Sequence, residues 1–361
     1  MINSTVTRRG LLAGAAGLAA ASTLGACASG KKPDAGGTGK KLTITVTPFA
    51  GADLGVMPKE FAKDYMDSHP TVDIKLDDTL LFTKQTAQWA ADKTKPLCNL
   101  AFSNAGSTAA GKATGMYMKL DPDQIPNAGK VSEDLTDPDW VGMPLGADQL
   151  GLLYNTEGLT PAPTSWSRLW AEDMTGKLCF FTMPWEAIGM ASVLSGGGWT
   201  DFDPGFEIWA SRAKNIRTIV SANPQYLNVL STGEAVLTSH YHGTSQVWKA
   251  GGAPLEFASP EEGTVLVPVG VNINAGSSED QIEVMYDMIN EMLSPKWNQR
   301  WADLSLEMPA NSEVELTDKL KAHPAIAKGM DQKFQLVDWG VLGKNTAAWT
   351  KRWESDVVAK I

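Results

Sequence analysis

The sequence is poor in cysteine and histidine and has no excess of positive charge. Of its 361 residues, three are cysteine and four are histidine, and the formal net charge is −10 at pH 7. A chain of this charge without a basic stripe repels polyanions, so we expect no nucleic acid partner. His240 and His242 have the spacing of a metal-ligand pair, but no third ligand lies near them in the sequence. We therefore expect no metal and no cofactor.

Catalytic motifs are equally scarce. No G-x-S-x-G elbow is present, and no Ser/His/Asp set stands out. Residues 106–113 match most of a phosphate-binding loop, but Ala113 stands where a Ser or Thr hydroxyl must hold magnesium. A helix entrance built of small residues explains the same pattern, and its free backbone N–H groups would suit an anionic ligand. We expect a binding protein rather than an enzyme, with a secreted hydrolase or a structural surface lipoprotein as the alternatives.

No apolar run is long enough to predict a membrane-spanning helix. The apolar stretch near the N-terminus is short and rich in alanine and glycine, whereas spanning requires about 20 strongly apolar residues. Arg8 and Arg9 precede it, and residues 24–27 resemble the lipobox of bacterial lipoproteins. These features predict a twin-arginine lipoprotein signal peptide over residues 1–26, a lipid on Cys27 and a flexible tether over 27–40. The mature protein is then extracytoplasmic, either lipid-anchored to the outer face of the cell membrane or in the periplasm.

The other two cysteines, Cys98 and Cys179, leave two interpretations open. They would form a disulfide if they met in an oxidising compartment. Twin-arginine substrates generally fold in the reducing cytosol before export, which favours two buried free thiols. Each cysteine lies beside a strand-like run, far from the other in the sequence. We favour the free thiols.

Hydrophobic periodicity predicts strands alternating with helices. The expected strands are 42–46, 72–76, 97–102, 151–154, 178–181, 235–237 and 265–269. The expected helices are 58–68, 83–92, 166–170, 185–194, 279–293, 296–304, 317–322 and 345–360. Short connections between such elements are typical of parallel sheets in an α/β fold. Because the pattern restarts after about residue 150 with no low-complexity linker, we predict two tightly joined lobes.

Several short phrases, taken in order, resemble one family. They are residues 102–104, 115–121, 125–127, 141–144, 153–155, 163–166, 169–170, 176–177, 233–235, 259–263 and 308–311. Together they resemble the periplasmic spermidine/putrescine-binding proteins and their relatives among the bacterial solute-binding proteins of ABC importers. The resemblance covers essentially the whole mature chain and implies the two-lobed periplasmic-binding-protein fold, type II, with mostly parallel sheets and a hinge between the lobes.

The resemblance also implies discontinuous lobes, because the chain crosses the hinge more than once. We place the crossings near Ala147, Val269 and Lys321. Lobe 1 then comprises residues 41–147 and 270–320, and lobe 2 comprises 148–269 and 321–361. The implied mechanism is capture of a small molecule, closure of the lobes, and delivery by a monomer to an ABC transporter permease.

The family's ligand contacts carry over to this sequence only in part. The contact in the loop after the third strand falls on Asn104, a carboxylate at a helix start falls on Glu186, and an aromatic platform falls on Tyr241. Two other carboxylates fall on Met183 and Val269 and are lost. The resemblance thus implies a polyamine site that has been rebuilt.

Further residues complete the expected site. Phe49 stands where the family has an indole, Glu307 stands at an aromatic position, and Asp338 lies near a late polar contact. Trp185 opens a helix directly after an apolar strand and faces either ligand or core. A buried diamine needs a carboxylate at each end, and Asp148, Glu307 and Asp338 are the candidate replacements. We predict a polyamine-like or other organic cation, with an anionic or neutral solute as the alternative.

Overall fold

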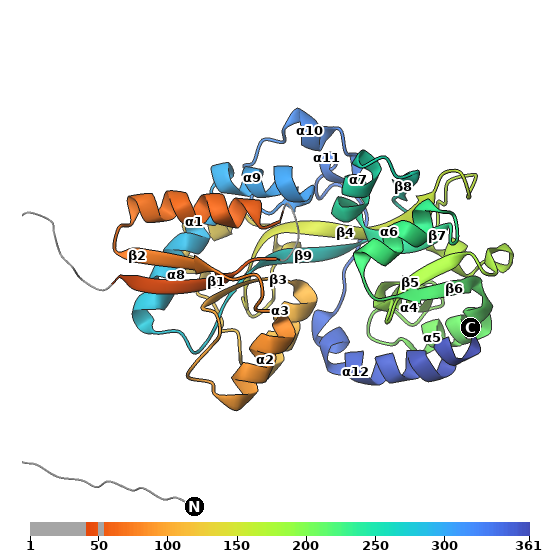
Figure 1. The fold of residues 1–361 in the computed structure, drawn as a ribbon, viewed down its shortest axis with the longest axis horizontal. Coiled ribbons are helices and arrows are strands. Elements are labelled where there is room, and N and C mark those ends of the chain that lie inside the picture. Colours follow the sequence, from red (N-terminus) through yellow and green to blue (C-terminus); the bar gives the residue numbers. More distant parts are fainter. Residues whose placement is uncertain (1–40, 50–53) are drawn as a thin grey trace, which may run out of the picture. The chain divides into compact units, whose positions relative to one another are not determined.

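Two long antiparallel strands, β4 (Met143–Asn155) and β9 (Thr264–Ile273), run through the middle of the fold (Figure 1). All 13 residues of β4 are buried. The computed structural model describes residues 41–49 and 54–361, which belong to one compact unit. The predicted signal peptide, the tether and Cys27 lie outside the described residues.

Parallel strands flank this central pair on both sides. On one side lie β1 (Leu42–Thr47), β2 (Val72–Leu76) and β3 (Leu100–Asn104), and on the other lie β5 (Leu178–Phe181), β6 (Ile216–Val220) and β7 (Leu237–Tyr241). The strand order is β2-β1-β3-β9-β4-β7-β5-β6. The pairs β1–β2, β1–β3, β5–β6 and β5–β7 are parallel, as predicted, whereas β4 and β9 pair antiparallel with each other and with β7 and β3.

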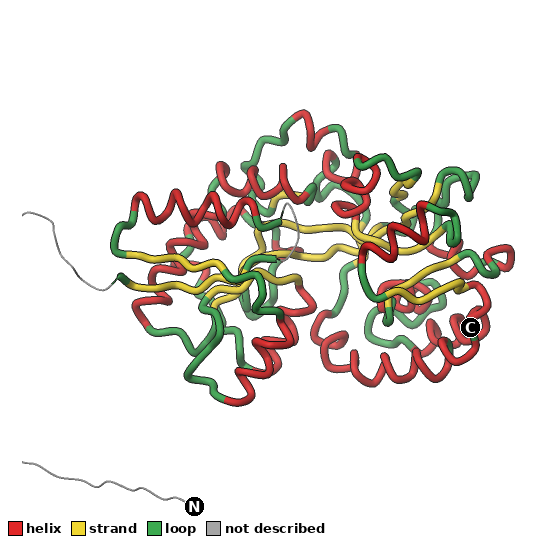
Figure 2. The backbone as a smooth tube through the Cα atoms, viewed as in Figure 1, coloured by secondary structure: helices red, strands yellow, loops and turns green. Residues whose placement is uncertain are grey.

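Three short strands complete the sheet, and helices cover both of its faces (Figure 2). The short strands are β8 (Leu255–Ala258), β10 (Met308–Pro309) and β11 (Phe334–Gln335). The helices are α1 (Val56–Ser68), α2 (Phe82–Ala91), α3 (Ala105–Thr114), α4 (Trp185–Val193), α5 (Asp203–Arg212), α6 (Asn223–Ser231), α7 (His242–Ala250), α8 (Glu279–Met292), α9 (Pro295–Ser305), α10 (Asp318–Lys321), α11 (Pro324–Ala327) and α12 (Trp339–Asp356). This is the predicted α/β class.

Local sequence explains the best-defined helices. Helix α8 begins with a capping box, in which Ser278 accepts from the Gln281 backbone and the Gln281 side chain accepts from Ser278. Its buried residues recur at helical spacing and pack against the sheet. Helix α9 begins at Pro295, where a missing N–H costs nothing. It ends at Leu306, which takes a left-handed conformation with φ 56° and turns the chain back toward β4.

The buried side chains form two large hydrophobic clusters that meet at the central strands. One cluster draws on residues between 44 and 147 and between 266 and 326. The other draws on residues between 150 and 267 and between 342 and 357. These two clusters support the lobe boundaries expected from the sequence, which remain a prediction.

The structure corrects several predicted elements. Strand β4 begins at Met143 rather than at 151, because Pro144 and Gly146, at a register shift in its pairing with β9, hide the strand pattern. Residues 166–170 form a 3₁₀ helix, and α12 begins at Trp339 rather than at 345. His240 and His242 do not share a strand face, because β7 ends between them and His242 begins α7.

Cys98 and Cys179 are free and buried, as we favoured. Within residues 41–49 and 54–361, no helix has the length and apolar character to cross a membrane. In the same residues, no group of three or more His, Cys, Asp or Glu side chains is placed to hold a metal ion.

Candidate functional site

Three carboxylates are buried near the central strands β4 and β9. Asp148 lies in β4, Glu186 is the second residue of α4, and Glu307 lies between α9 and β10. Their exposed fractions are 8%, 8% and 6%. Among the described residues, no lysine, arginine or histidine forms an ion pair with any of them. Buried carboxylates without a cationic partner are costly and mark a functional site.

Strand register explains why Asp148 and Glu307 meet. Strand β10 pairs antiparallel with β4, with Met308 opposite Ala147, so the same register continued by one residue sets Glu307 opposite Asp148. Asp148 Oδ1 accepts from the backbone N–H of Gln149 at 2.7 Å and of Gly243 at 3.2 Å. Burial raises the pKa of both carboxyls, and for Glu307 the neighbouring charge of Asp148 raises it further.

The third carboxylate reaches the same face of the sheet from helix α4. Ser239 of β7 donates its hydroxyl to Glu186 Oε1 at 2.5 Å. Burial raises the pKa of the Glu186 carboxyl to about 7, and the Ser239 hydrogen bond opposes this rise. Glu186 lies in the first turn of α4, where the helix dipole favours a negative charge.

Tyr241 lies near all three carboxylates. It is the last residue of β7 and lies opposite Leu150, two residues beyond Asp148, so the Tyr241 and Asp148 side chains share one face. Burial raises the pKa of the Tyr241 hydroxyl, and the charges of Glu186, Asp148 and Glu307 raise it further. We call Asp148, Glu186, Tyr241 and Glu307 the carboxylate cluster.

Aromatic side chains border the cluster on the side of β1. Trp301 Nε1 donates to Glu307 Oε2 at 2.8 Å and fixes the orientation of that carboxylate. The Phe49 ring lies 6.3 Å from both Trp301 and Phe102, centroid to centroid. The Trp301 side chain thus lies between Phe49 and Glu307. Trp301 is buried, and its hydrogen bond to Glu307 was not predicted from the sequence.

A second aromatic pair lies beside the start of α4. The rings of Trp185 and Trp339 are 5.4 Å apart in an edge-to-face arrangement, and both pack against the second hydrophobic cluster. The Trp339 ring lies near the start of α3, about 4 Å from the position that a Cβ atom at Gly106 would occupy. Trp185 therefore contacts both the hydrophobic core and Trp339 of α12. Trp339 was not predicted as a site residue from the sequence.

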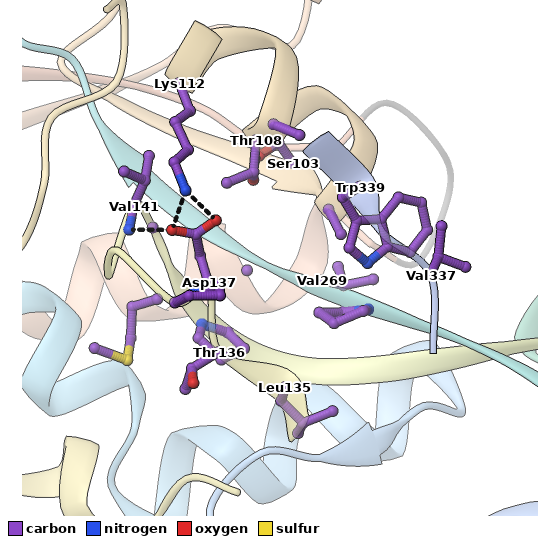
Figure 3. Close-up of a pocket in the computed structure, with 18 of the residues that line it drawn as sticks. Ser103, Thr108, Lys112, Leu135, Thr136, Asp137, Val141, Val269, Val337 and Trp339 are labelled. Atoms are coloured by element: carbon purple, nitrogen blue, oxygen red, sulfur yellow. Dashed lines mark hydrogen bonds and ion pairs between the residues drawn. The ribbon is translucent and has the colours of Figure 1, made fainter. Parts of the chain in front are cut away.

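Asn104 and Asp338 each cap a helix. The Asn104 side chain caps α3 by accepting from Ser107 N at 3.0 Å, so it already uses one of the N–H groups that an anion would need. Asp338 caps α12 by accepting from Val341 N at 2.9 Å and lines a cavity of about 370 Å³ together with Val269 and Trp339 (Figure 3). The structure thus gathers Asp148, Glu186, Tyr241 and Glu307, with Phe49 and Trp185 in the surrounding aromatic walls.

The raised pKa values predict that the ligand-free protein loses stability as the pH rises. Unfolded Asp and Glu release their protons near pH 4, whereas the folded protein holds those protons to higher pH. Between about pH 6.5 and pH 8 the folded state binds more protons, so the free energy of unfolding falls by about 1.4 kcal/mol per pH unit for each such proton. Below that range His240 and His242 act in the opposite direction, because burial lowers their pKa values to about 4 and the unfolded imidazoles bind protons that the folded ones do not. The melting temperature, measured from about pH 6.5 to pH 8, should therefore fall.

Glu186→Gln should make this fall less steep, because the amide keeps the acceptor for Ser239 and has no proton to lose. The exposed Glu133 supplies the matched control, and Glu133→Gln should keep the wild-type slope. Equal slopes in the two variants, or a melting temperature that rises over this range, would contradict the assignment.

Comparisons with known proteins agree with this fold. Residues 57–328 match the family model described as bacterial extracellular solute-binding protein. A spermidine/putrescine-binding periplasmic protein of Haemophilus influenzae is 27% identical over 238 residues, which cover 60% of this chain and 63% of that protein.

Solved structures resemble nearly the whole chain. An ABC transporter protein of Clostridium perfringens has a TM-score of 0.72 at 20% identity, covering 88% of this chain and 100% of its own. A spermidine/putrescine ABC transporter substrate-binding protein of Streptococcus pneumoniae has a TM-score of 0.72 at 15% identity, covering 89% and 100%. The chain belongs to the bacterial extracellular solute-binding protein family.

Proposed function

We propose that the protein is the substrate-binding component of an ABC transporter and that it captures a small organic cation at the carboxylate cluster. The observation that carries this proposal is the burial of three carboxylates without a cationic partner among the described residues. The transport roles of the relatives described above support this role.

The arrangement of the cluster favours a ligand with two ammonium groups. Asp148 and Glu307 lie opposite each other and form one negative pole, and Glu186 forms a second one on the other side of Tyr241. An ammonium group at each pole would neutralise the charge of the buried carboxylates there. The rings of Tyr241, Phe49 and Trp185 suit the apolar chain between the ammonium groups and add cation–π attraction.

The two-lobed fold supplies the mechanism. The cluster combines groups from both predicted lobes, since Glu307 belongs to lobe 1 and Glu186 and Tyr241 belong to lobe 2. A cation that contacts both sides binds the closed form better than the open form and shifts the population toward closure. The permease can then distinguish the loaded protein from the empty one.

Binding without catalysis fits the same residues best. The carboxylates accept from hydroxyl, indole and backbone donors, and in the described chain no histidine side chain hydrogen-bonds to them or to Ser239. An anionic solute fits poorly, because the cluster is negative and Asn104 occupies its own helix start.

Export and anchoring belong to this proposal as well. The protein would leave the cytosol by the twin-arginine route, carry a lipid on Cys27, and act as a monomer at the outer face of the cell membrane or in the periplasm. The family's extracellular description supports a location outside the cytoplasm.

Calorimetric titration with a panel of solutes tests the ligand class. Putrescine, spermidine and related amines should bind, whereas a plain sugar and an organic anion should not. Glu186→Gln should weaken binding of the tightest amine by about 2 to 4 kcal/mol, roughly 30- to 700-fold, because one ammonium loses its buried partner. Glu133→Gln makes the same chemical change at an exposed site and should leave the affinity unchanged. Tighter binding of a sugar or an anion than of every amine would overturn the proposal.

Fractionation of a bacterium that expresses the full chain tests the anchor. Cys27→Ser should move the protein from the membrane fraction to the soluble fraction, because the acylated side chain is lost. Cys98→Ser changes a buried thiol that lies inside the fold and should leave the protein with the membrane. If Cys27→Ser stays in the membrane fraction, the lipid anchor is wrong.

A further inference from the structure

His242 and His323, which are far apart in the sequence, meet in a groove outside the carboxylate cluster. The groove has a volume of about 480 Å³ and lies between α7, β8 and the connection from α10 to α11 (Figure 1). No residue of the carboxylate cluster lines it, and neither does Asn104, Val269 or Asp338. We call it the histidine groove.

The His242 ring is held in the tautomer that a metal ion needs. Its Nδ1 lies 3.2 Å from the carbonyl oxygen of Leu306. Because a carbonyl only accepts hydrogen bonds, Nδ1 carries the hydrogen and Nε2 of the neutral ring carries the lone pair. Phe257 packs edge-to-face against the ring, with the centroids 5.1 Å apart. Metal-binding histidines are commonly oriented by such a hydrogen bond to a backbone carbonyl.

The Nε2 lone pair of His242 is available to the groove. His242 is only 3% exposed and lines the groove, and Nε2 has no hydrogen-bond partner within residues 41–49 and 54–361. The nitrogen is thus a buried acceptor that the fold itself leaves unused.

The spacing of the two rings matches that of two imidazoles on one metal ion. Their centroids are 5.5 Å apart. An ion about 2.1 Å from one nitrogen of each ring, at a tetrahedral angle, sets the centroids about 5.3 Å apart. The backbone of His323 is fixed, because its N–H donates to Leu320 O at 3.0 Å and its carbonyl accepts from Ile326 N at 2.9 Å. Its ring has no hydrogen bond to the described residues, so it can turn a nitrogen toward His242.

Both imidazoles are neutral at pH 7. Burial lowers the pKa of His242 to about 4, and burial and the charges of Lys319 and Lys249 lower the pKa of His323. Protons compete with a metal ion for the imidazole nitrogen, so these low pKa values favour the metal.

The charges around the groove select transition metals over Mg²⁺ and Ca²⁺. Lys249 lines the groove, and its ammonium is bonded to Glu256 Oε2 at 2.6 Å. Lys319 Nζ donates to the Asp303 carbonyl at 2.6 Å. These ammonium groups repel Mg²⁺ and Ca²⁺, which prefer carboxylate and carbonyl oxygens. Zn²⁺, Ni²⁺ and Cu²⁺ bind imidazole nitrogens well.

We propose that the histidine groove binds a divalent transition-metal ion such as Zn²⁺ through Nε2 of His242 and one ring nitrogen of His323. Water molecules complete the coordination, because no third His, Cys, Asp or Glu side chain of the described chain is placed to join the pair. The ion joins α7 to the chain at the predicted hinge crossing near Lys321. Neither histidine belongs to the carboxylate cluster, so this site does not depend on amine binding.

Calorimetric titration of the full chain with ZnCl₂ at pH 7 tests this proposal, with MgCl₂ as the control. A Kd of about 1 to 200 µM is expected for Zn²⁺, because the groove supplies two of the four ligands of a structural zinc site. Mg²⁺ should not bind. Saturating putrescine should leave the zinc affinity unchanged, whereas zinc held by the carboxylate cluster would be displaced. Failure of putrescine to bind would count against the proposed function alone.

Variants locate the site. His323→Asn removes one ligand at a partly exposed position and should weaken zinc binding more than about tenfold. His242→Asn should weaken it as much, with circular dichroism as the check on its fold. His69→Asn makes the same change at a histidine that does not line the groove and should keep the wild-type affinity. Wild-type affinity in His323→Asn, binding of Mg²⁺ as tight as that of Zn²⁺, or displacement of zinc by putrescine would overturn the proposal.

Discussion

The burial of three carboxylates that have no cationic partner in the part of the chain that the structure describes is the constraint on which the rest of this molecule depends. Each of them comes from a different part of the chain, and in the empty protein each must hold a proton or carry an uncompensated charge. Hydrogen bonds from Ser239, Trp301 and the Gly243 backbone orient the carboxylates but do not neutralise them. The proposed cation would relieve this unfavourable free energy on binding.

The pairing of the central strands determines where these carboxylates lie. Strand β4 contributes Asp148 and pairs with β7, β9 and β10, so the register of one strand gathers groups from distant parts of the chain. The two hydrophobic clusters meet along the same strands. In the proposed function, a cation that relieves charge repulsion there would favour one arrangement of the predicted lobes over another.

The sequence predicted the α/β class because strand and helix periodicities alternate in short segments, and it placed Glu186 correctly at the start of a helix after an apolar strand. It could not reveal that Asp148 and Glu307 lie opposite each other, because that proximity comes from a pairing of only two residues, β10 with β4. The full length of β4 was hidden by Pro144 and Gly146. Sequence order carries no information on which cavity a helix cap faces, so the position of Asp338 beside Val269 and Trp339 is visible only in the structure.

Proton release on ligand binding tests the central claim most directly. Titration calorimetry of putrescine at pH 7, repeated in two buffers of different ionisation enthalpy, counts the protons that binding moves. If a cation replaces the protons held by the buried carboxylates, the protein should release about one proton or more per ligand. Tight binding with no proton exchanged, or with proton uptake, would contradict the account.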